Sequence, residues 1–152
     1  MKKIITKNEN ETKKLGERLA KGFGNGETVA FEGDLGAGKT TLIKGIAKGF
    51  GIQRNITSPT FVLMKVYDTD SHGLRTDGHG SRITRLVHVD AYRIGDGQEL
   101  IDIGIGEYLD DEKTVVVIEW AEKVREILPS DTVWIKMKHG RKENERVIMI
   151  DK

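Results

Sequence analysis

A glycine-rich segment of eight residues has the clearest chemistry in the chain. Residues 33–40 read Gly-Asp-Leu-Gly-Ala-Gly-Lys-Thr and fit G-x-x-x-x-G-K-[ST], the pattern of a phosphate-binding P-loop. Glycines let successive backbone N–H groups turn inward around a phosphate, and the helix that follows directs its positive end at the same point. Lys39 can reach the β- and γ-phosphate oxygens, and Thr40 offers a hydroxyl to Mg²⁺. The pattern therefore predicts a site for a nucleoside triphosphate with Mg²⁺.

Two acidic residues end apolar segments of the chain. Asp90 follows residues 86–89, and Glu119 follows the apolar run 114–118. A P-loop enzyme needs an acid at the end of a neighbouring strand to hold or orient Mg²⁺, and open α/β sheets place their ligand sites at strand ends. We expect one acid to anchor Mg²⁺ with its water shell, and the other to orient or deprotonate the attacking water. The residue types do not decide which acid has which role.

A hydroxyl-rich segment, residues 57–60, lies between the P-loop helix and the next expected strand. In switch-type nucleotidases a hydroxyl at this place senses the γ-phosphate and Mg²⁺, whereas the alternative is a plain Ser-Pro turn. We place Thr60 in the expected catalytic set, together with Asp90 and Lys39. Arg93 either stabilises the charge of the transferring phosphate or pairs with an acid.

The elements that must position these residues alternate between strands and helices. The P-loop lies between an expected strand, 28–31, and an expected helix, 39–49, while Asn8 and Glu11 suggest a capped helix at 8–23. Further along we expect strands at 61–67, 83–89 and 114–118, an irregular or weakly helical segment at 98–109, a short helix at 121–128, and a closing hairpin of 132–138 with 145–150. This order predicts an α/β fold with a mixed sheet.

Composition excludes several classes of protein. The 152 residues suit one domain over 1–152, and no run of about 18 apolar residues suggests a membrane span. The absence of cysteine excludes thiolate zinc sites, catalytic cysteines and disulfides. A net charge of +1 argues against binding nucleic acid by bulk charge. The first residues are too polar for a signal peptide, so we expect a soluble, cytoplasmic protein. We also expect the chain alone to be a monomer or a weak oligomer.

Four sequence blocks together resemble the TsaE family, small bacterial ATPases that serve tRNA threonylcarbamoyladenosine synthesis. The blocks are residues 32–41, 58–61, 88–93 and 119–120, and their order and spacing match. The first expected helix matches as well. The resemblance therefore covers nearly the whole chain, and it implies a P-loop NTPase-like three-layer sandwich with a mixed central β-sheet.

The resemblance also implies a ligand set. It assigns ATP and Mg²⁺ to the site, with Thr40 and Glu119 at the metal-binding positions and Asp90 as the essential acid. Glu9 and the turn at Gly140 match places where relatives contact the nucleotide. The implied nucleotide-binding residues are Glu9, Gly33, Gly36, Ala37, Gly38, Lys39, Thr40, Thr41 and Gly140.

The partners implied by the resemblance are homologues of TsaB and TsaD. The resemblance implies that TsaD transfers the threonylcarbamoyl group to the adenosine beside the anticodon, and that ATP hydrolysis by TsaE resets the complex between turnovers. Contact with tRNA would then be indirect, through the complex. A switch segment that is ordered only with a partner implies weak hydrolysis by the chain alone.

Two segments raise separate questions. Residues 68–82 look longer than the usual turn, and we interpret His72 and His79 within them as solvated rather than metal-binding because no third ligand is near. The basic residues within 136–142 suggest a solvated strand edge that discourages aggregation, with contact to tRNA or a partner as the alternative.

Other functions remain open from the residues alone. The main alternative is a small-molecule or nucleotide kinase, which would need a second substrate pocket and an arginine-bearing lid. A GTPase is disfavoured because no [NT]-K-x-D motif occurs. A non-enzymatic nucleotide-dependent adaptor and a direct nucleic-acid binder are the remaining candidates.

Overall fold

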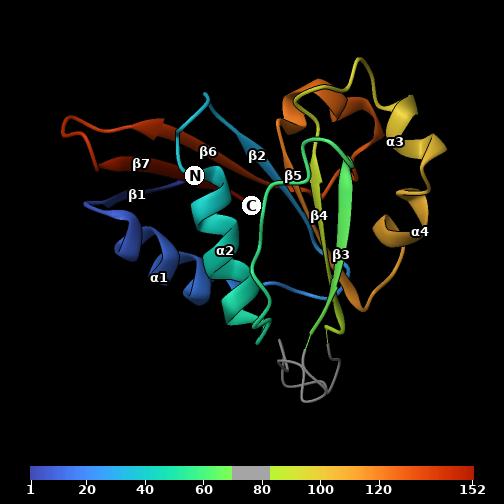
Figure 1. The fold of residues 1–152 in the computed structure, drawn as a ribbon, viewed down its shortest axis with the longest axis horizontal. Coiled ribbons are helices and arrows are strands. Elements are labelled where there is room, and N and C mark those ends of the chain that lie inside the picture. The colour runs from blue at the N-terminus through green and yellow to red at the C-terminus, as the bar shows by residue number, and fades with distance from the viewer. Residues whose placement is uncertain (70–82) are drawn as a thin grey trace.

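One seven-stranded sheet forms the centre of the fold (Figure 1). The structure is a computed structural model, and it describes residues 1–69 and 83–152. The strand order is β1-β7-β6-β2-β5-β4-β3. The strands are β1 (Lys2–Thr6), β2 (Thr28–Glu32), β3 (Met64–Asp68), β4 (Arg85–Asp90), β5 (Thr114–Glu119), β6 (Val133–His139) and β7 (Arg146–Asp151). The central strands β6, β2, β5 and β4 run parallel, and β3, β7 and β1 are antiparallel to their neighbours. The expected mixed sheet is confirmed.

Helices cover both faces of the sheet, which gives the expected three layers. The helices are α1 (Glu9–Ala20), α2 (Lys39–Gly49), α3 (Gln98–Asp102), α4 (Gly106–Leu109) and the 3₁₀ helix η1 (Ala121–Ile127). One hydrophobic cluster joins α1 and α2 to the sheet, and a second joins the segment that carries α3, α4 and η1 to the opposite face. None of these helices is long and apolar enough to cross a membrane.

Side-chain alternation decides which face of the sheet each strand-end acid uses. On β5, Val115 and Val117 belong to the cluster under α1 and α2, whereas Val116 and Ile118 belong to the other cluster. Successive strand residues point to opposite faces, so Glu119 is on the α2 side. On β4, Leu86 belongs to the α1 and α2 cluster, which puts His88 and Asp90 on that same side.

Helices α1 and α2 pack very closely. At Gly45 of α2, a Cβ atom would lie 2.1 Å from the carbonyl oxygen of Lys13 on α1. Glycine is therefore required at this crossing, which fixes α2 against α1 and with it the start of α2 at the P-loop.

The structure differs from the expectation at several element boundaries. Helix α1 ends at Ala20, and Phe23, which fits its apolar periodicity, enters the core from the turn that follows. Strand β3 begins at Met64 rather than residue 61, because Leu63 has φ +63° and breaks the extended backbone. Strand β1, which the sequence did not predict, pairs with β7 as a largely exposed edge strand. His72 and His79 lie outside the described residues.

Candidate functional site

The P-loop joins the end of β2 to the start of α2. Gly36 and Gly38 adopt φ +76° and +96°, and Gly38 is the N-cap of α2. Such positive φ values are readily available only to glycine, so the sequence pattern is a requirement of the backbone path. The first N–H groups of α2 have no intrahelical acceptors and carry the positive end of the helix dipole. The loop thus provides the amide environment of an anion site.

Lys39 is the first residue of α2 and is almost completely buried, with 4% of its surface exposed. Its Nζ donates hydrogen bonds to the carbonyl oxygens of Gly33 and, at 3.0 Å, Asp34. The same nitrogen lies 4.0 Å from the ring centroid of Trp120. Burial lowers the pKa of the Lys39 ammonium below its usual value, and nearby carboxylates, Glu119 foremost, oppose that shift.

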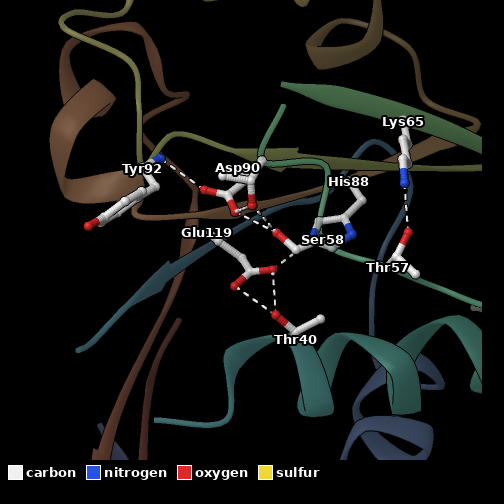
Figure 2. Close-up of polar contacts among 9 residues, drawn as sticks. Thr40, Thr57, Ser58, Lys65, His88, Asp90, Tyr92 and Glu119 are labelled. Carbon is white, nitrogen blue, oxygen red and sulfur yellow. Dashed lines mark hydrogen bonds and ion pairs between the residues drawn. The ribbon is translucent and has the colours of Figure 1, made fainter. Parts of the chain in front are cut away.

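Glu119 connects the first turn of α2 to the sheet (Figure 2). The Thr40 hydroxyl donates to the Glu119 carboxylate and lies 3.0 Å from Oε1 and 3.1 Å from Oε2. On the sheet side, His88 Nε2 lies 2.8 Å from Glu119 Oε1. Thr40 and Glu119, which were expected to share a metal, are therefore in direct contact.

Asp90 organises a second group of polar contacts beside the first. Its Oδ2 accepts hydrogen bonds from Ser58 Oγ at 2.5 Å and Thr60 Oγ1 at 3.0 Å, and its Oδ1 accepts from the Tyr92 N–H at 2.9 Å (Figure 2). Asp90 and Glu119 are register partners on the adjacent parallel strands β4 and β5. The structure thus brings together both acids and the hydroxyl-rich segment.

One cavity of about 490 Å³ contains these groups. Its lining includes most of the residues that the sequence assigned to the nucleotide, the metal and catalysis: Glu9, Gly36, Ala37, Gly38, Lys39, Thr40, Thr41, Thr60, Asp90 and Glu119. Gly33 is not part of the lining but accepts the hydrogen bond from Lys39. Gly140 lines a different cavity with Lys3 and His139, so its predicted contact with the nucleotide gains no support from this geometry.

Sequence reasoning did not assign several lining residues to the site. Asn144 and Arg146 come from the β6–β7 connection and from β7, and no local pattern marks them. Trp120 has φ +60°, an uncommon value for a bulky residue. This conformation turns the chain sharply after Glu119, and the Trp120 ring packs against the Tyr92 ring in a tilted arrangement, with 5.0 Å between centroids and 51° between ring planes. Conformations of this kind cluster at functional sites, but they cannot be read from residue types.

The oxygen donors of the cavity are chemically suited to Mg²⁺. Thr40 and Glu119 offer a hydroxyl and a carboxylate, and Asp90 adds a second carboxylate nearby. Within residues 1–69 and 83–152, no group of three or more His, Cys, Asp or Glu could hold a metal ion. Mg²⁺ is usually bound through one or two carboxylates together with phosphates and water, rather than by an all-protein cage. The residues therefore fit Mg²⁺ that arrives with a phosphate ligand.

Comparison with known proteins identifies close relatives. The family model described as threonylcarbamoyl adenosine biosynthesis protein TsaE matches residues 6–148. The tRNA threonylcarbamoyladenosine biosynthesis protein TsaE of Bacillus subtilis is 38% identical over 143 residues, which cover 94% of this chain and 80% of the relative. The protein of the same name from Treponema pallidum is 38% identical over 136 residues, covering 90% of each chain.

A solved structure has the same fold. The crystal structure of YdiB from Bacillus subtilis superimposes with a TM-score of 0.74 at 33% sequence identity. The match covers 97% of this chain and 82% of the other. The sheet and helices that position the site thus have an experimentally determined counterpart.

Proposed function

The chain belongs to the TsaE family of tRNA threonylcarbamoyladenosine biosynthesis proteins, and from this premise we propose that it is a Mg²⁺-dependent P-loop ATPase of that pathway. One observation carries the proposal. The Lys39 ammonium and the Thr40 hydroxyl of a P-loop share a single cavity with two strand-end carboxylates, Asp90 and Glu119. This combination meets the chemical needs of triphosphate binding and hydrolysis.

The P-loop side of the cavity binds the nucleotide. The amides of the loop and of the first turn of α2 bind phosphate oxygens, and Lys39 exchanges its two backbone carbonyl partners for phosphate. Thr40 and Glu119 hold Mg²⁺. Bound Mg²⁺ neutralises charge on the phosphates. Thr12, Asn144 and Arg146 line the same cavity and are available to the rest of the nucleotide.

Contacts in the site support different roles for the two acids. Glu119 contacts Thr40, the hydroxyl that the P-loop pattern assigns to the metal. Asp90 instead contacts Ser58 and Thr60, on the segment where a γ-phosphate sensor is expected. We therefore place Glu119 on the metal and Asp90 on the attacking water, with Ser58 and Thr60 orienting the Asp90 carboxylate.

Around the cavity, exposed apolar side chains favour action on a partner. Leu35, within the P-loop, is 78% exposed, Phe61, next to Thr60, is 83% exposed, and the neighbouring Val62 is 60% exposed. Exposed apolar groups gathered near one site are typical of protein interaction surfaces. We infer that the partners are TsaB and TsaD homologues, that tRNA contact is indirect, and that hydrolysis resets their complex between turnovers in the cytoplasm.

Phosphate release is the direct test of this proposal. We expect the purified chain to release inorganic phosphate slowly from ATP with Mg²⁺, and faster when the TsaB–TsaD complex is added. Asp90→Ala should abolish release while ATP still binds, because the hydrogen bonds of Asp90 go to Ser58, Thr60 and Tyr92 rather than to the P-loop lysine or threonine. Equal rates with and without the complex, or full release by Asp90→Ala, would contradict the proposal. Transfer of the phosphate to a small acceptor would instead indicate a kinase.

A further inference from the structure

His88 is a fully buried polar residue that the proposed chemistry does not use. Its side chain has no exposed surface, and its Nε2 lies 2.8 Å from Glu119 Oε1. Its other ring nitrogen, Nδ1, has no hydrogen-bond partner among the described residues. Among the described residues, the His88 side chain therefore makes one hydrogen bond, to the Glu119 carboxylate that we assign to the metal.

From this geometry we propose that His88 is a positioning residue that fixes the orientation of the Glu119 carboxylate for Mg²⁺. The proposal rests on the proposed function, because it needs Glu119 to serve the metal. Among the described residues the hydrogen bond of His88 goes to Glu119 and not to Thr40 or the P-loop, so His88 acts through Glu119.

The contacts of Glu119 show why a second partner is needed. The Thr40 hydroxyl is almost equally distant from both carboxylate oxygens, 3.0 and 3.1 Å, so it does not select one of them. His88 bonds only Oε1 and thereby fixes the rotation of the carboxylate about its terminal bond. The lone pairs of the Glu119 carboxylate that His88 does not use, mainly those on Oε2, then point in a constant direction on the α2 side of the sheet and are available to Mg²⁺.

Electrostatics makes this restraint important. Asp90 is the register partner of Glu119, and both carboxylates are on the same side of the sheet. Without a donor on Oε1, repulsion between the two carboxylates and attraction to the Lys39 ammonium would decide where Glu119 points. Hydrogen-bond partners of metal-binding carboxylates commonly control metal affinity in this way.

Three substitutions separate positioning from packing. His88→Leu removes the Nε2 donor and fills its place in the core with an apolar side chain of similar bulk. His88→Gln carries an amide nitrogen near the place of Nε2 and retains the bond, whereas His88→Asn carries its amide near the place of Nδ1 and loses it. Val87→Ala is the matched control, because Val87 is the adjacent β4 residue and packs on the opposite face of the sheet.

Calorimetric titration with ATP, once with Mg²⁺ and once with EDTA, tests the proposal without any measurement of turnover. For His88→Leu and His88→Asn we expect affinity in Mg²⁺ to fall about 10- to 100-fold, the usual cost of losing such a partner, and affinity in EDTA to stay unchanged. His88→Gln should restore most of the Mg²⁺-dependent affinity, and Val87→Ala should retain all of it.

The possible results are distinguishable. Wild-type affinity in Mg²⁺ for His88→Asn, or an equal loss with and without Mg²⁺, would overturn the positioning role. If His88→Leu does not fold, the comparison of His88→Asn with His88→Gln still decides, because both variants place an amide in the core. If the native chain itself gains no affinity from Mg²⁺, the proposed function fails rather than the role of His88.

Discussion

Replacing Lys39 by methionine tests the central element of the site. The substitution keeps a long unbranched side chain and removes only the ammonium. In the native chain this ammonium donates hydrogen bonds to the carbonyls of Gly33 and Asp34 and lies beside the Trp120 ring. A hydrogen bond from a charged donor contributes about 1.5–3 kcal/mol. Since about 1.4 kcal/mol corresponds to tenfold in affinity, we expect the affinity for ATP with Mg²⁺ to fall about 10- to 150-fold.

The stability of the free chain should respond much less to the same substitution. Lys39→Met takes the lysine donor from the Gly33 carbonyl, while the Asp34 carbonyl keeps its hydrogen bond from the Ala37 N–H at 3.1 Å. The substitution also removes a cation whose burial is unfavourable, as the lowered pKa of Lys39 shows. These contributions oppose each other, so we expect the free energy of unfolding to change by less than about 1 kcal/mol.

The lowered pKa of Lys39 also predicts a pH dependence with a definite sign. Between its folded-state pKa and the ordinary lysine value, the unfolded chain binds more protons than the native chain. Stability therefore rises with pH within that window. Lys39→Met should remove this part of the rise.

Calorimetry gives the affinity, and urea denaturation gives the stability. Lys48→Met is the matched control because it makes the same change on α2 at an exposed lysine that pairs with Glu17. It should bind ATP like the native chain. An unchanged affinity in Lys39→Met, or an equal loss in Lys48→Met, would refute the assignment of residues 33–40 to phosphate binding.

Three further substitutions give independent predictions. Gly45→Ala places a Cβ within 2.1 Å of the Lys13 carbonyl oxygen and should lower the free energy of unfolding by about 1–3 kcal/mol in urea denaturation. Thr60→Val removes a hydroxyl that donates to Asp90, so phosphate release should fall about tenfold while calorimetric ATP affinity is retained. The Thr114 hydroxyl, first among its partners, lowers the pKa of Asp111, so this carboxylate contributes stability above its ordinary pKa that is lost as pH falls through the lowered one. Asp111→Asn should therefore flatten the acidic side of a stability-versus-pH curve; an unchanged curve would contradict this.

Local patterns were sufficient to predict much of the fold. The P-loop, the capped first helix and the apolar run of β5 each depend on residues close together in sequence, and the structure has all three. The strand-end positions of Asp90 and Glu119 also follow from periodicity. Alternation and turn chemistry act locally, so a single sequence records them.

The unpredicted features depend on contacts between distant segments. Arg146 reaches the cavity only because β6 lies beside β2 and β7 beside β6. The bond between His88 and Glu119 joins residues on two adjacent strands separated by 31 positions. Strand β1 is polar and largely exposed, and its pairing with β7 is the feature that makes it a strand. Neighbouring residue types do not encode these relations.

Because Asp90 and Glu119 are cross-strand partners, the site tolerates only certain changes in the length of β4 and β5. Deleting one residue inside β4 or β5 would send that strand's acid to the opposite layer of the sandwich, because faces alternate with a period of two. Deleting two would restore the layer but shift that acid about 6–7 Å along its strand relative to its partner. Length variation is therefore compatible with the site in the connections that precede these strands, and an odd change within either strand separates the two carboxylates.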